Sequence, residues 1–88
     1  NRIMKKILPV GSVVKVKQQN EFLMMISGYY PVTENGELFD YFGVIYPCGI
    51  LSEQSIFMFY EDDIENILFE GFQDDVGKMV TSILEQGE

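Results

Sequence analysis

Residues 21–30 are EFLMMISGYY, and this stretch decides which fold the sequence predicts. In an extended strand, successive side chains point to opposite faces of the sheet. Both faces of this strand are apolar, with Phe22, Met24 and Ile26 on one and Leu23 and Met25 on the other. Such a strand is central in its sheet, or another element covers its second face. Gly28 predicts a bulge or bend, which lets a small sheet curl.

Strand patterns lie on both sides of this stretch. Before it, residues 12–18 (SVVKVKQ) alternate valine with lysine as a half-buried strand does, and Gln19-Asn20 predicts a tight turn. After Pro31, Asn35-Gly36 predicts a hairpin loop. Residues 38–46 (LFDYFGVIY) then predict a third strand.

The segment after residue 46 contains two more apolar runs. Pro47-Cys48-Gly49 ends the third strand, because proline interrupts strand pairing and glycine permits a tight turn. Residues 56–60 (IFMFY) predict a fourth strand, residues 61–64 a single helical turn, and residues 66–72 (NILFEGF) a fifth strand. We therefore expect four or five short antiparallel strands.

The C-terminal segment changes from a strand period to a helix period. Its apolar residues follow the i, i+3, i+4, i+7, i+8 spacing of an amphipathic helix: Val76, Met79, Val80, Ile83 and Leu84. Asp74 can cap the start of this helix and Gly87 its end. Such a stripe usually packs within its own chain and less often docks on a second chain, and the sequence leaves both interpretations open.

These patterns together predict a β-rich α+β fold. We expect a small curled antiparallel sheet or partly open barrel of four to five strands, with one C-terminal amphipathic helix. The 88 residues are expected to form a single domain, since two would leave neither with enough core. Residues 1–7 remain open to being a loose or tag-derived N-terminal extension of that domain.

Charge and composition exclude several classes of function. The net charge of −8 argues against nucleic-acid binding, which needs a cationic surface. No apolar run approaches the roughly 18–20 residues of a membrane span, so we expect no membrane insertion. A single cysteine cannot form an internal disulfide, which favours a reduced, cytoplasmic setting. Residues 61–75 hold seven acids and no base, and would be neutralised within the fold if the basic first strand lay beside them.

The sequence offers little equipment for catalysis or for binding a cofactor. Histidine is absent, which removes the commonest general base and a frequent zinc ligand. Cys48 has no cation near it in sequence to activate its thiol. Residues 61–66 (EDDIEN) do not match the spacing of a calcium-binding EF-hand loop. We expect no cofactor and no metal, and keep as an alternative a small hydrolase or thiol enzyme that uses Cys48 or paired carboxylates.

The aromatic residues are more numerous than a core of this size can readily bury. The chain has five tyrosines and seven phenylalanines. Most must be buried, but a few can form an exposed apolar patch of the kind that binds proteins. Our candidate protein-interaction residues combine tyrosines with the helix stripe: Tyr29, Tyr30, Tyr46, Tyr60, Met79 and Ile83.

Four motifs in order resemble a known family. They are LPVGSVV (8–14), YFGV with YPCG (41–44 and 46–49), FYEDDI (59–64) and ILFEGF (67–72). The chain resembles the DUF4176 family, a domain of unknown function found in small proteins of Gram-positive bacteria. The resemblance implies no catalytic residues, and Cys48 occupies the variable position of the family's Y-P-x-G motif.

The resemblance also implies a cellular setting. Members of this family are often encoded near type VII secretion genes and the toxins that they export. We therefore expect a non-enzymatic protein-interaction module with an accessory, adaptor or chaperone-like role in type VII secretion. Its partner would be another protein, such as a secretion substrate or its accessory protein, and a homodimer remains open.

Overall fold

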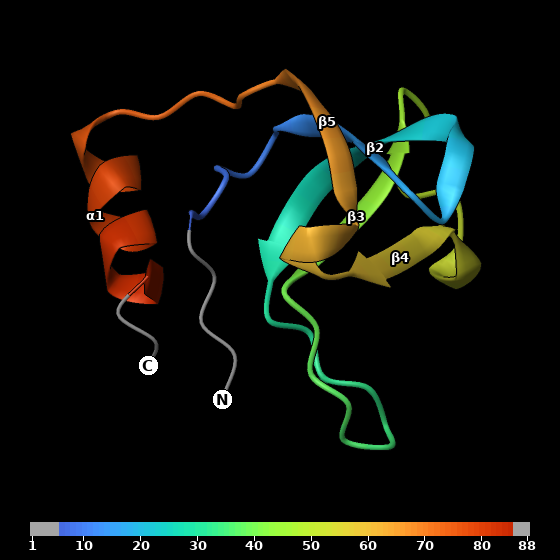
Figure 1. Cartoon of the computed structure of the whole chain (residues 1–88). Helices are drawn as coiled ribbons and strands as arrows, with labels where there is room; N and C mark the ends of the chain where they lie inside the picture. The colour runs from blue at the N-terminus through green and yellow to red at the C-terminus, as the bar shows by residue number, and fades with distance from the viewer. Residues whose placement is uncertain (1–5, 86–88) are drawn as a thin grey trace.

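The computed structural model describes residues 6–85, with the backbone alone for Asn20. It is a β-rich α+β fold, with a five-stranded antiparallel sheet that does not close into a barrel and one C-terminal helix (Figure 1). The strands are β1 (Val13–Val16), β2 (Gln19–Tyr29), β3 (Tyr41–Tyr46), β4 (Ile56–Phe59) and β5 (Ile64–Phe69), in the spatial order β4-β3-β2-β1-β5. Two short 3-10 helices, η1 (Glu53–Ser55) and η2 (Glu61–Asp63), precede β4 and β5, and α1 (Asp75–Glu85) follows.

Strand β2 is the centre of the sheet, as its two apolar faces predict. It pairs with β1 on one side and β3 on the other. Met24 and Ile26 are fully buried, and their face of the sheet forms the core. The pairing with β3 shifts register between Ile26 and Gly28, so the predicted bulge is confirmed. A Cβ at Gly28 would overlap the ring of Phe42, which explains the glycine.

The predicted turn before β2 and the predicted third and fifth strands differ from the structure by two or three residues. The turn before β2 lies at Lys17-Gln18 and not at Gln19-Asn20, because Val16 pairs directly with Gln19 across a two-residue loop. The third strand begins at Tyr41 rather than at residue 38, where Leu38 makes only an isolated bridge to Val32. The fifth strand covers residues 64–69 rather than 66–72, because its pairing with β1 ends at Val13.

The predicted hairpin loop and the predicted turns hold the strands in place. In the loop between β2 and β3, the amide of Thr33 donates to the carbonyl of Glu37, and Gly36 has a φ of 87° that favours glycine. The single helical turn predicted at residues 61–64 is η2. It is fixed by the buried Asp40, whose Oδ2 accepts a hydrogen bond of 2.6 Å from the amide of Glu61.

The N-terminal segment from Lys6 to Ser12 lies between α1 and the sheet (Figure 1). Ile7 and Leu8 are buried in the core. The hydroxyl of Tyr41 accepts a hydrogen bond of 3.1 Å from the amide of Leu8 and donates to the carbonyl of Lys6 at 3.3 Å. This segment therefore covers the core face of the sheet as part of the fold.

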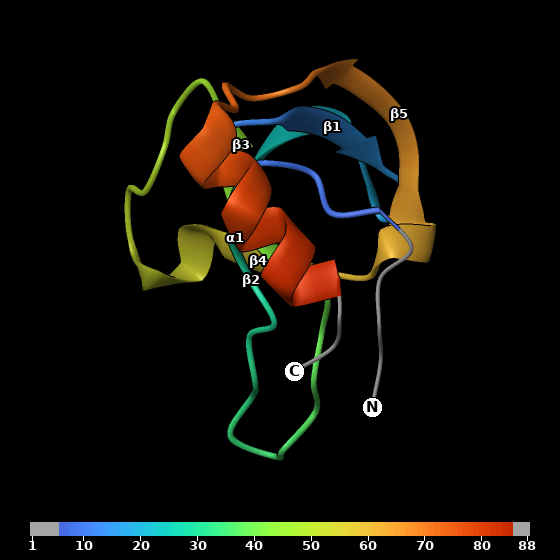
Figure 2. The same cartoon turned by 90° about the vertical axis from the view of Figure 1, so that its left-hand side faces the viewer.

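The helix α1 begins where the sequence predicts. The Oδ1 atom of Asp74 accepts a hydrogen bond of 3.0 Å from the amide of Gly77, which confirms the N-terminal cap. The predicted cap at Gly87 lies outside the described residues. Figure 2 shows α1 in front of the strands. Leu84 of this helix packs against the core.

Candidate functional site

The apolar face of α1 points away from the core. Val76, Met79, Val80 and Ile83 are 63%, 59%, 46% and 58% exposed. They are the first four members of the stripe that the sequence predicts, and only the fifth, Leu84, packs on the core. The sequence left open whether this stripe packs internally. In the structure, four of its five residues are exposed at the surface. We call these four exposed residues the α1 stripe.

The inward side of α1 is held by small and polar groups. Thr81 is buried, donates to the carbonyl of Lys78 at 3.2 Å and accepts a hydrogen bond of 3.0 Å from the amide nitrogen Nε2 of Gln73. Glu85 accepts a hydrogen bond of 3.2 Å from the amide of Ile7. The helix thus rests on these polar contacts, on Leu84 and on Val80, which lines a small cavity with Val10 and Tyr29, while Val76, Met79 and Ile83 remain exposed.

A second exposed apolar surface lies on the sheet itself. A shallow groove of about 550 Å³ is lined by Gly11 and by side chains of four strands: Val13, Leu23, Met25, Tyr46, Leu68 and Phe69. We call this surface the outer groove, because it lies on the face of the sheet opposite to Met24 and Ile26. The sequence reasoning missed Leu68, Phe69 and the neighbouring Phe72, which is 84% exposed. The signal was present, since the run NILFEGF has no polar alternation.

The six predicted interaction residues do not form a single patch. Met79 and Ile83 belong to the α1 stripe, and Tyr46 lies in the outer groove. Tyr29 packs against the core and donates its hydroxyl to the carbonyl of Leu8. Tyr30 is half-buried, and its hydroxyl is buried without a hydrogen-bond partner among residues 6–85.

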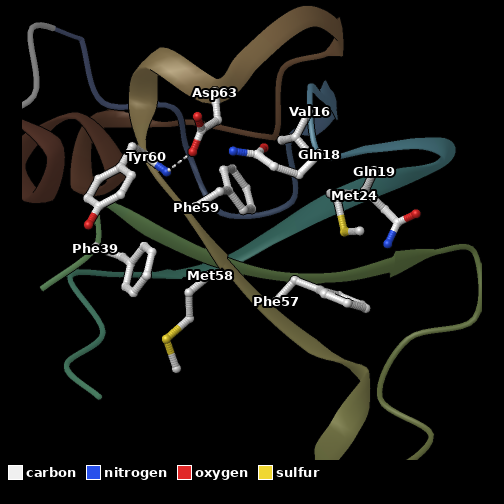
Figure 3. A pocket seen from close by; sticks show the side chains of 10 residues that line it. All are labelled: Val16, Gln18, Gln19, Met24, Phe39, Phe57, Met58, Phe59, Tyr60 and Asp63. Atoms are coloured by element: carbon white, nitrogen blue, oxygen red, sulfur yellow. Dashed lines mark hydrogen bonds between the residues drawn. The ribbon is translucent and has the colours of Figure 1, made fainter. Parts of the chain in front are cut away.

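The remaining predicted tyrosine, Tyr60, borders a separate cleft. This cleft of about 480 Å³ is lined mainly by aromatic and methionine side chains (Figure 3). Tyr60 stacks on Phe39 with ring centroids 4.7 Å apart, and its hydroxyl donates to Glu37 at 2.8 Å. Asp63 is the one carboxylate in the lining, and it accepts a hydrogen bond of 3.0 Å from the amide of Tyr60. The lining therefore offers no pair of carboxylates for acid–base chemistry.

Cys48 lies in an exposed turn. Pro47 and Cys48 form the turn, Gly49 has a φ of 76°, and the amide of Gly49 donates to the carbonyl of Ile45 at 2.9 Å. The turn that the sequence predicts at these residues is confirmed. The thiol is exposed on this turn and lines neither the cleft nor the outer groove.

Residues 6–85 contain no group of three or more aspartate, glutamate or cysteine side chains placed to hold a metal ion. No helix between those residues has the length and apolar character that crossing a membrane would require.

The basic strand β1 lies beside part of the acidic segment, as the sequence reasoning considered. The two strands pair along their length, and the amide of Lys17 donates to the carbonyl of Asp63 at 2.9 Å. Beyond β1, the ammonium group of Lys6 lies 3.5 Å from the carboxylate of Glu70, with both side chains largely exposed. An exposed ion pair of this kind adds little to stability.

The electrostatics of the core centre on two tyrosines. Burial raises the pKa of the Tyr41 hydroxyl, and the nearby charges of Glu61 and Asp40 and the neighbouring Tyr29 raise it further. Burial also raises the pKa of Tyr29. Both hydroxyls are therefore neutral hydrogen-bonding groups at neutral pH.

The first and last sequence motifs meet at one point of the structure. The Ser12 hydroxyl donates to the carbonyl of Pro9 at 2.7 Å and accepts a hydrogen bond of 2.9 Å from the amide of Gly71. A Cβ on Gly71 would clash with the carbonyl of Val10 and approach the amide of Ser12 to 3.0 Å. The LPVGSVV and ILFEGF motifs thus serve the fold, by joining the turn before β1 to the chain after β5.

The fold and its surfaces define a class: a small, open-sheet α+β domain with apolar side chains left exposed on its helix and on one sheet face. The chain belongs to the family described as Domain of unknown function (DUF4176), whose sequence model matches residues 7–80. That match confirms the resemblance drawn from the four motifs. Searches of curated proteins and of solved structures give no match.

Proposed function

We propose that this protein is a non-enzymatic protein-interaction module with an accessory, adaptor or chaperone-like role in type VII secretion. The observation that carries the proposal is the outward direction of the α1 stripe. An amphipathic helix of 11 residues gains its stability mainly from burying its apolar face. A second protein that covers Met79 and Ile83 would supply that burial.

The absence of enzymatic activity is part of the proposal. In its support, the cleft beside Tyr60 has a single carboxylate in its lining, and that carboxylate already accepts a backbone hydrogen bond. Cys48 lies apart from this cleft on an exposed turn. A thiol needs a nearby base or cation to act as a nucleophile.

The setting in type VII secretion rests on what membership of the family implies. Because such proteins are often encoded near secretion genes and toxins, the proposed partner is a secretion substrate or its accessory protein. The proposed location is the cytoplasm, where a substrate would be held before export.

The experiment is co-expression with each protein encoded beside its gene, followed by size-exclusion chromatography with light scattering. We expect one of these proteins to elute with this chain as a stable complex. In the double variant Met79→Glu/Ile83→Glu, two carboxylates replace exposed apolar side chains, and we expect the complex to weaken at least tenfold.

The control is Val32→Glu, which places one carboxylate on an exposed aliphatic residue in the loop between β2 and β3. This variant should retain the complex. If no neighbouring protein forms a complex with the wild-type chain, the proposed function fails. A complex that tolerates the double variant would instead remove α1 from the binding surface.

A further inference from the structure

The helix α1 is held to the rest of the molecule by a small set of contacts. Of its 11 residues Thr81 alone is buried, and Leu84 packs against the core as a partly buried side chain. The amide of Ile7 donates a hydrogen bond of 3.2 Å to the carboxylate of Glu85, and Val80 borders a cavity. A segment that buries few apolar side chains opens at a lower free energy than the whole protein unfolds.

The space between α1 and the N-terminal segment is incompletely filled. A cavity of about 210 Å³ is lined by Val10 and Tyr29 and, from α1, by Gly77 and Val80. Side chains that border an empty space lose dispersion contacts on that side. Gly77 also weakens the helix itself, because glycine loses more backbone freedom on folding than any other residue. The interface beneath α1 therefore stabilises its docking less than a closely packed interface would.

The chain before α1 contains a fixed residue, followed by a place where it can bend. Gly71 is fixed, because its amide donates to the Ser12 hydroxyl at 2.9 Å and an added Cβ would clash with the carbonyl of Val10. Phe72 comes next, is 84% exposed and lies outside regular secondary structure. Figure 1 shows the extended orange chain that leads from β5 across to α1. Rotation at Phe72 would move α1 and leave Gly71 in place.

The two residues after Phe72 belong with the helix. Nε2 of Gln73 donates to the Thr81 hydroxyl at 3.0 Å, and Oδ1 of Asp74 accepts a hydrogen bond of 3.0 Å from the amide of Gly77. Both bonds join residues within 73–85, so they hold this stretch together and do not tie it to the sheet. We call residues 73–85 the lid.

The hydrophobic core is built without the lid. Among the described residues, every buried member of the core cluster comes from the N-terminal segment or from a strand. Ile7 and Leu8 belong to it, and the hydroxyls of Tyr29 and Tyr41 bind the backbone of Leu8. These contacts remain when the lid leaves, so the sheet has the means to stay folded.

We propose that the lid detaches as one unit, by rotation at Phe72, while the five-stranded sheet stays folded. A helix of 11 residues is marginally stable by itself in water, so the lid loses its helical structure when it detaches. Detachment uncovers Val10 and Tyr29 beneath the helix and exposes Leu84 in addition to the α1 stripe. The proposal concerns the chain by itself and does not rest on the proposed function.

Amide hydrogen exchange of the full chain, followed by NMR, tests the lid. We expect the amides of residues 79–84 to have closely similar protection factors, at least 100-fold lower than that of Ile26. The reference amide of Ile26 lies in β2, where the residue is fully buried, and donates to the carbonyl of Ser12 at 2.8 Å. Amides that exchange through one common opening report a cooperative unit. Protection equal to that of Ile26 would overturn the proposal, as would a steady decline from residue 79 to residue 84, which indicates fraying.

Two truncations separate opening of the lid from unfolding of the whole chain. Val44→Ala shortens a buried side chain of β3 that lies outside the core cluster contacted by Leu84. It should lower the protection of Ile26 at least fivefold and change that of the lid less than twofold, because β3 is intact both before and after the lid opens. Leu84→Ala is the matched control and should lower both, since either opening breaks the Leu84 contact. An equal fall in both regions with Val44→Ala would mean that α1 unfolds only with the whole protein, and the proposal would be wrong.

A third variant removes the closed lid altogether. Ser82 is an exposed residue of α1, and proline there deletes a helical amide and clashes with the preceding turn. Ser82→Pro should reduce the helical signal in circular dichroism, while Ile26 stays protected from exchange and the amide resonances of β2 and β3 stay dispersed. Ser82→Ala is its control and should keep the helix. If Ser82→Pro exposes Ile26 to exchange at the rate of an unfolded chain, the sheet depends on α1 and the lid does not exist.

Discussion

The segment from Lys6 to Ser12 and the helix α1 lie side by side, but different interactions hold them. The segment is bound through its backbone: hydroxyls of Tyr29 and Tyr41 and carboxylates of Glu61 and Glu85 all bond to its amides or carbonyls. Its apolar side chains Ile7 and Leu8 are buried. By contrast, α1 buries Thr81 and part of Leu84 and exposes its apolar stripe.

The difference separates residues that maintain the fold from residues available for binding. Buried backbone groups must be paired, so the tyrosines and acids around the N-terminal segment are structural. The α1 stripe and the outer groove pair no buried backbone groups. Because their apolar side chains stay exposed to water, they do not contribute the free energy that burial would supply to folding. Variants in the first region should therefore change unfolding, and variants in the second should change binding.

The largest effect on stability is expected for Gly71→Ala. The added Cβ would clash with the carbonyl of Val10 and push the chain after β5 away from the Ser12 hydroxyl. Overpacking against backbone together with one lost hydrogen bond should lower the free energy of unfolding by about 2–4 kcal/mol. Urea denaturation of this variant and of the wild type measures the change in the free energy of unfolding.

Gly77→Ala is the matched control for that variant. Its Cβ would lie 3.0 Å from the Cγ atom of Gln73 and 3.7 Å from Oδ1 of Asp74, both side-chain atoms that can move slightly, and alanine favours the helix by up to about 1 kcal/mol. We expect this variant to be neutral or more stable. A Gly71→Ala protein as stable as Gly77→Ala would mean that the junction of the two motifs is not a constraint on the fold.

The next effect is expected for Tyr41→Phe. The fully buried ring is retained, but the amide of Leu8 loses its acceptor and the carbonyl of Lys6 its donor. Leaving a buried amide unpaired should lower the free energy of unfolding by about 1–3 kcal/mol. Tyr46→Phe, at an exposed tyrosine, should change it by less than about 0.5 kcal/mol. Equal midpoints for the two variants would contradict the structural role of the Tyr41 hydroxyl.

Alkaline pH should weaken the hydrogen bonds that the Tyr41 and Tyr29 hydroxyls make to the N-terminal segment. The pKa values of Tyr41 and Tyr29 are raised in the folded state, mainly by burial. Above pH about 10 the unfolded chain releases protons that the folded protein retains, so stability falls as pH rises, by up to about 1.4 kcal/mol per pH unit for each tyrosine. Below that pH the contribution is fully present. Denaturation at pH 8 and pH 10.5 should show a smaller fall for Tyr41→Phe than for the wild type.

The sequence predicts the sheet well, because its strand patterns are local. The apolar residues on both faces of β2 predict its central position in the sheet, and Gly28 predicts the bulge. The start of β3 is mispredicted because Leu38 and Phe39 have strand-like side chains, while the pairing that defines the strand is set by distant residues of β2 and β4. No sequence pattern shows that Ser12 and Gly71 meet, since 59 residues separate them.

The surfaces could be predicted only in part. Met79 and Ile83 were selected from the helix period, which gives a face but not its direction. That direction is set by the burial of Thr81 and Leu84 on the inward side of the helix and by the hydrogen bond from the amide of Ile7 to Glu85. Tyr29 and Tyr46 were both selected because the chain is rich in aromatic residues, which does not tell a buried tyrosine from an exposed one. In the structure the Tyr29 hydroxyl donates to the carbonyl of Leu8.

The smallest and most discriminating effect is expected within α1, where neighbouring residues have opposite surroundings. Leu84→Ala removes the aliphatic side chain of the helix that packs on the core, and half of the usual cost of a buried leucine is about 1–2.5 kcal/mol. Ile83→Ala removes a side chain that is 58% exposed, and alanine is the better helix former, so stability should stay level or rise slightly. Thermal and urea unfolding of the two variants give the comparison directly. An Ile83→Ala protein as destabilised as Leu84→Ala would place the α1 stripe in the core, and a partner would then have no exposed apolar face of α1 to bind.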